Sequence, residues 1–79
     1  MWTIAAVGTR EGVIKEIQAA KPTPPEADAA QLESIKPLLV AEVNGLDAEF
    51  NGARLSASGD ALKTSRNVTV QLVGIKLHL

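Results

Sequence analysis

The chain has 79 residues, of which 46% are hydrophobic, and its 8 Lys and Arg residues nearly balance 9 Asp and Glu residues. This length predicts one domain over residues 1–79, and the apolar content is too high for a disordered chain. The even charge and the two isolated aromatic residues, Trp2 and Phe50, exclude a nucleic-acid partner. With no cysteine and one histidine, we expect no disulfide, no metal site and no cofactor.

The N-terminal segment does not resemble a targeting sequence. It carries no early basic residue, and it reaches Arg10 and Glu11 after a short apolar run. A secretory signal needs the opposite arrangement. No run of about 20 apolar residues could span a membrane. We therefore expect no membrane association.

The first 21 residues predict a strand followed by a helix. Residues 2–7 are nearly all apolar, as in a strand covered on both faces. Thr9 is placed to cap a helix whose apolar residues recur at helical spacing from Val13 to Ala20. Pro22 ends this helix and opens a stiff connector over residues 22–25.

A second helix is predicted from Asp28, which is expected to be its N-cap, to about Asn44. Its apolar stripe consists of Leu32, Ile35, Leu39, Val43 and Leu46. Pro37 conflicts with an unbroken helix because proline removes a backbone hydrogen bond. The conflict leaves two alternatives open: a helix kinked at Pro37, or a later start with Ser34 as the cap.

The last third of the chain alternates with the period of a strand. Asn51–Gly52 predicts a two-residue hairpin turn, with a short extra strand over residues 48–50. A half-buried strand follows from Ala53 to Ala57, and a polar loop then runs to residue 67. In the final strand the apolar positions change phase after Leu72, which predicts a bulge or bend at Val73–Gly74.

These elements predict an α+β fold in the order β-α-α-β-β. Two helices are expected on one face of a three- to four-stranded, mainly antiparallel sheet. They cannot cover both faces, so we expect the remaining apolar residues to form an interface with another protein. This predicts a homo-oligomer or a subunit of a larger assembly. The expected interface residues are Trp2, Ile75, Leu77 and Leu79.

A weaker candidate is a site for an anionic small molecule such as a nucleotide. Thr9, Arg10 and Gly12 lie at the predicted start of the first helix, where free N–H groups attract anions. Lys63 and Arg66 of the polar loop could add positive charge. The alternatives are an ordinary strand-to-helix turn and a solvated loop, and Glu11 would repel an anion.

No pattern indicates an enzyme. The serines have no histidine base nearby in sequence, and His78 has no evident acidic partner. The three acids Glu42, Asp47 and Glu49 match no calcium-loop spacing. We therefore expect a protein that works by binding.

The chain resembles small uncharacterised proteins of tailed bacteriophages over most of its length. The resemblance rests on a strand leading into residues 8–14, on residues 55–59 and on residues 66–71. It implies a compact β-α-α-β-β domain in a virion or in the host cytoplasm, and it carries over no catalytic residue. It implies either a virion component, such as a capsid-decorating protein, or an early protein that inhibits or sequesters a host molecule.

Overall fold

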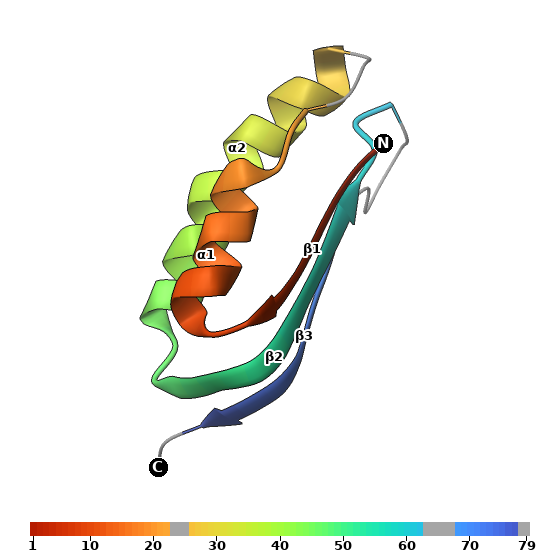
Figure 1. Ribbon diagram of the computed structural model, residues 1–79. Coiled ribbons are helices and arrows are strands. Elements are labelled where there is room, and N and C mark those ends of the chain that lie inside the picture. The colour runs from red at the N-terminus through yellow and green to blue at the C-terminus, as the bar shows by residue number, and fades with distance from the viewer. Residues whose placement is uncertain (23–25, 63–67, 78–79) are drawn as a thin grey trace.

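The computed structural model describes residues 1–22, 26–62 and 68–77, with only the backbone described for Leu77. The elements are β1 (Trp2–Gly8), α1 (Arg10–Ala19), α2 (Glu26–Gly45), β2 (Ala48–Gly59) and β3 (Val68–Leu77). The described strands form one antiparallel sheet in the order β1-β2-β3. The α+β class and the β-α-α-β-β order are confirmed. Figure 1 shows both helices on the same side of the curved sheet.

One buried cluster joins the helices to the inner face of the sheet. Val13 and Ile17 of α1 and Leu32 of α2 are fully buried in this cluster, together with the alternate residues of β1 and β2. Trp2 belongs to it, with only 1% of its surface exposed. The indole N–H of Trp2 donates to Gln31 Oε1 at 2.7 Å. The expectation that Trp2 contributes to an interface is therefore wrong, because its own fold encloses it.

The start of α1 is as predicted. Thr9 is the N-cap, with extended backbone, and its hydroxyl accepts the N–H of Gly12 at 3.2 Å. This bond satisfies one of the N–H groups that a helix leaves free at its start. The cap fixes the sharp change of direction between β1 and α1.

The second helix begins earlier than predicted. It starts at Glu26, so Asp28 lies in the first turn, fully buried, and is not the cap. Pro37 lies inside a continuous helix, which makes the later start at Ser34 wrong. Pro37 and Glu33 are both exposed. Water can therefore hydrate the Glu33 carbonyl that loses its donor to the proline.

The predicted hairpin at Asn51–Gly52 is wrong. β2 is one strand from Ala48 to Gly59, and the segments on both sides of Asn51–Gly52 pair with β3. Phe50 pairs with Ile75 and Arg54 pairs with Val73, so residues 51–53 lie opposite Gly74 alone. The irregularity predicted near Gly74 is confirmed, but the surplus residues belong to β2.

This bulge keeps Leu72 and Ile75 of β3 on the same face. Leu72 pairs with the buried Leu55, and Ile75 pairs with the buried Phe50. Residues that pair directly across antiparallel strands share a face. The change of phase in the sequence therefore does not send Ile75 to the second face, because the bulge compensates for it.

The second face of the sheet is exposed and made mostly of small or polar side chains. Three rows cross it: Thr3, Ser58 and Thr69; Ala5, Ser56 and Gln71; and Val7, Arg54 and Val73. A shallow hollow of about 330 Å³ lies over the first two rows. The large apolar residues of the strands thus point mainly to the helical side. Within the described ranges, neither helix has the length and apolar character needed to cross a membrane.

Candidate interaction surface

The turn predicted to bind an anion is held by contacts within the fold. The Arg10 guanidinium donates to the backbone carbonyls of Val43, Leu46 (2.7 Å) and Ala48 (2.7 Å). Its carbon Cζ also lies 4.6 Å from the centre of the Phe50 ring, a cation–π distance. Arg10 thus ties the start of α1 to the end of α2 and to the beginning of β2.

These contacts favour the ordinary strand-to-helix turn over the ligand site. Carbonyl groups at a helix C-terminus carry partial negative charge, so the cation of Arg10 satisfies them in place of water. The N–H of Gly12 is bonded to the Thr9 hydroxyl. Lys63 and Arg66, the other residues of the predicted anion site, lie outside the described residues.

The inner face of β3 carries apolar residues that are only partly covered. Val68, Leu72 and Ile75 are half-buried and pack against the core, whereas Val70 is 46% exposed. All of them occupy positions that pair with inner-face residues of β2. The backbone of Leu77 pairs with that of Ala48. Leu79 lies outside the described residues.

Val70 is exposed because the helices lie over the other two strands. In the described parts of the chain, both helices bring Cα atoms within 8 Å of β1 and β2, and neither does so for β3. Both helices lie in the chain between β1 and β2, and β3 pairs with the far side of β2. The helices therefore cover the inner row of β3 only in part, with Val68, Leu72 and Ile75 half-buried and Val70 exposed.

The flank of α2 that faces away from α1 adds a second exposed apolar residue. Leu38 is 62% exposed. It lies about 200° around the helix from Val40, which faces the groove between α1 and α2. Leu38 is therefore on the opposite flank from α1, beside the half-buried Ile35. We call Val70 and the half-buried residues of the same inner-face row, Val68, Leu72 and Ile75, the β3-side surface.

Strand β3 is also an edge of the described sheet. Its only partner there is β2, so one row of its backbone N–H and C=O groups has no strand beside it. Edge strands usually carry charges, prolines or bulges that prevent pairing with another chain. Residues 68–73 contain none of these, and the bulge begins only at Gly74.

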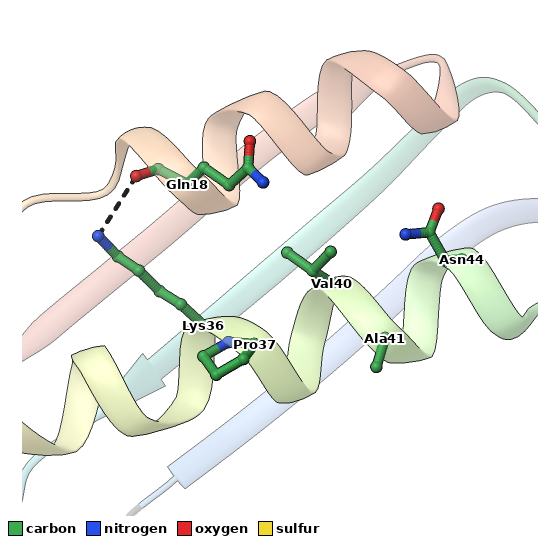
Figure 2. Close-up of a pocket in the computed structure, with 6 residues that line it drawn as sticks. All are labelled: Gln18, Lys36, Pro37, Val40, Ala41 and Asn44. Atoms are coloured by element: carbon green, nitrogen blue, oxygen red, sulfur yellow. Dashed lines mark hydrogen bonds between the residues drawn. The ribbon is translucent and has the colours of Figure 1, made fainter.

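A groove of about 530 Å³ separates α1 from α2 on the outer side of the helical layer (Figure 2). Val40, Pro37 and Ala41 supply its apolar part, and Lys36 crosses it to reach the backbone carbonyl of Gln18 at 3.3 Å. Lys36 also pairs with Glu33 at 3.2 Å. Because the ammonium group of Lys36 already contacts Gln18 and Glu33, its hydrogen-bond donors are largely used within the fold and not offered to a ligand in the groove.

Sequence reasoning found the apolar final strand but not its critical residue. It expected Ile75 to be exposed, whereas Val70 is the β3 residue whose exposure breaks the inner row. The signal was present in the alternation of Val68, Val70 and Leu72. The sequence pattern does not show that the helices lie over β1 and β2, and this position is what leaves Val70 exposed.

Comparisons with family models, with curated proteins and with solved structures find no match for this chain. The resemblance to tailed-phage proteins thus stays a prediction. Within the described residues, no group of three or more His, Cys, Asp or Glu side chains is arranged to hold a metal ion.

Proposed function

We propose that this protein is a non-enzymatic interaction protein that acts through self-association on its β3-side surface. The exposure of Val70 supports the proposal most directly. This residue continues a row whose other described members are half-buried, yet it lies 46% open on an edge strand. Burying such a row against another chain is favourable by about 25 cal/mol per Å² of apolar area.

The size of the molecule is compatible with this role. A stable interface buries at least about 600 Å² on each partner. The whole chain exposes 5290 Å², so roughly one-ninth of its surface would be enough. The small α+β fold also gains stability from association, because short chains bury a limited share of their surface.

In a biological setting, the protein would be a subunit of a larger assembly. The resemblance to tailed-phage proteins suggests an accessory virion component, for example one that decorates a capsid. Detection of the chain in purified particles by mass spectrometry would support this assignment. If infected cells contain the protein but particles purified from them do not, the virion role is wrong. That result would not contradict self-association.

Self-association is tested by multi-angle light scattering over a concentration series. The expected species has a mass at least twice the monomer mass of 8.3 kDa. Val70→Lys places a charge in the apolar row and should weaken association about tenfold or more, a change of roughly 1.4 kcal/mol. The variant should keep the circular dichroism spectrum of the folded wild type, because Val70 is already half-exposed.

Val7→Lys is the matched control. Val7 is also a strand valine, 63% exposed, but it lies on the second face of β1. It should leave association unchanged. A folded wild-type protein that stays monomeric at every concentration would contradict the proposal, and so would equal effects of the two substitutions.

A further inference from the structure

We infer that two copies of the chain pair through β3 in antiparallel register centred on Val70, forming one continuous sheet from the two three-stranded sheets. This inference rests on the proposed self-association and specifies its geometry. It starts from the edge of β3 that has no strand beside it in the described sheet, and from the uncharged run Val68 to Val73 along that edge. A partner strand would supply the missing backbone hydrogen bonds along this edge.

The order of residues in β3 is self-complementary about Val70. In a two-fold antiparallel pair centred there, Val70 lies opposite its own copy. Val68 then lies opposite the partner copy of Leu72, and Thr69 lies opposite that of Gln71. Apolar residues of the inner face meet apolar residues, and polar residues of the second face meet polar residues. Such cross-strand pairs are the unit of sheet stability.

Other registers fit less well. A register shifted by one residue would pair Val70 with Gln71 of the other copy. The inner face of one copy would then lie on the same side as the second face of the other, so the apolar rows would not meet. A register centred on Gln71 would set Val68 opposite Gly74, where φ is +79° and the bulge bends the strand. The register centred on Val70 uses only residues 68–72, on the regular side of the bulge.

A second copy fits this edge better than a chain bearing charges. Residues 68–75 contain no acidic or basic side chain, so the edge offers no charge to select an ionic partner, and two copies do not repel each other there. The other edge, β1, has its inner row fully covered, with Trp2, Ile4 and Ala6 at most 4% exposed. Pairing through β3 is therefore favoured, since only there does association bury an exposed inner-face residue.

The register can be read by disulfide formation, because the natural chain contains no cysteine. Val70→Cys places the two thiols opposite each other, within the Cβ separation of cross-strand pairs. Mild oxidation of this variant at the concentration where the wild type associates should give mainly covalent dimer. Val73→Cys is the control, because it lies on the same strand at 53% exposure. In the inferred register its two copies are six residues apart along the strand, about 20 Å.

The outcomes separate this inference from the proposed function. Efficient cross-linking of Val70→Cys, several-fold above Val73→Cys, supports the register. If the wild type associates but Val73→Cys cross-links as well or better, the register is wrong and self-association stands. Growth into open polymers would also overturn it, because β3 pairing with β1 of the next copy gives a chain that does not close. A protein that remains monomeric overturns both.

Discussion

Gly59 at the end of β2 lies directly beneath the indole of Trp2. A Cβ atom at position 59 would come within 2.5 Å of both Trp2 Nε1 and Gln31 Oε1, the two atoms of a buried hydrogen bond. The absence of a side chain at Gly59 therefore lets Trp2 reach α2. The first pairing of the sheet, Trp2 with Gly59, is thus coupled to the contact between sheet and helix.

Gly59→Ala should destabilise the protein by about 1–3 kcal/mol, because the added methyl group overpacks this site. Urea denaturation followed by tryptophan fluorescence measures the loss, and the indole itself reports the change. Gly45→Ala is the matched control, since nothing lies within 4 Å of a Cβ there. Equal stabilities of the two variants would show that the site accommodates a methyl group.

Arg10 should matter for stability far more than an exposed arginine does. Arg10→Met removes three charge-assisted hydrogen bonds to carbonyl groups, so we expect a loss of about 2–4 kcal/mol. Arg10→Lys should recover little, because one ammonium group cannot reproduce the planar fork of the guanidinium. Arg54→Met, at an exposed strand position, should change stability by less than about 0.5 kcal/mol. Thermal unfolding by circular dichroism compares the three.

The buried carboxylate of Asp28 should make folding sensitive to acid. Hydrogen bonding to the Met1 amino group lowers the pKa of Asp28 below its ordinary value of 3.8, burial opposes this shift, and the Ala61 N–H at 2.6 Å supports it. A lowered folded-state pKa means that the stabilisation is complete above 3.8 and is lost as the pH falls through the folded-state pKa.

Asp28→Asn tests this dependence. The variant should be less stable than the wild type at neutral pH, and its stability should change less as the pH is lowered below about 4. Urea titrations at several pH values provide both quantities. Glu16→Gln, at an exposed position of α1, is the control. If Asp28→Asn loses as much stability at low pH as the wild type does, another carboxylate is responsible.

Gly74 should resist substitution because of its backbone conformation. Its φ of +79° lies in the left-handed region, which costs other residues about 1–2 kcal/mol. Gly74→Ala should lose about that amount, whereas Gly74→Asn should lose less, since asparagine tolerates positive φ. Chemical denaturation measures the free energies of unfolding of the wild type and the two variants and so gives their order of stability. An alanine variant as stable as the wild type would mean that β3 can relax without the bulge.

Replacing Pro37 should strengthen α2. Proline inside a helix leaves one carbonyl without its donor, so Pro37→Ala should add about 1–3 kcal/mol of stability. The position is exposed, so the substitution removes no core contact. A loss of stability on thermal unfolding would show that the proline packs usefully in the groove between the helices.

The sequence alone determined the element types, their order and most of the core. Local signals suffice for these: the helical spacing of Val13 and Ile17, the cap at Thr9 and the alternation of Ala53, Leu55 and Ala57 each act over a few residues. The irregularity at Gly74 was also visible, because a change of phase in an apolar row requires a local compensation.

Only the tertiary structure decided which residues are available to a partner. Asn51–Gly52 carries hairpin chemistry, but pairing of both neighbouring segments with β3 made it a bulge. The guanidinium of Arg10 meets carbonyls more than 30 positions away, which no local pattern records. The exposure of Val70 depends on where two helices lie over a three-stranded sheet, because burial is set by contacts between elements and not by the hydrophobicity of a strand.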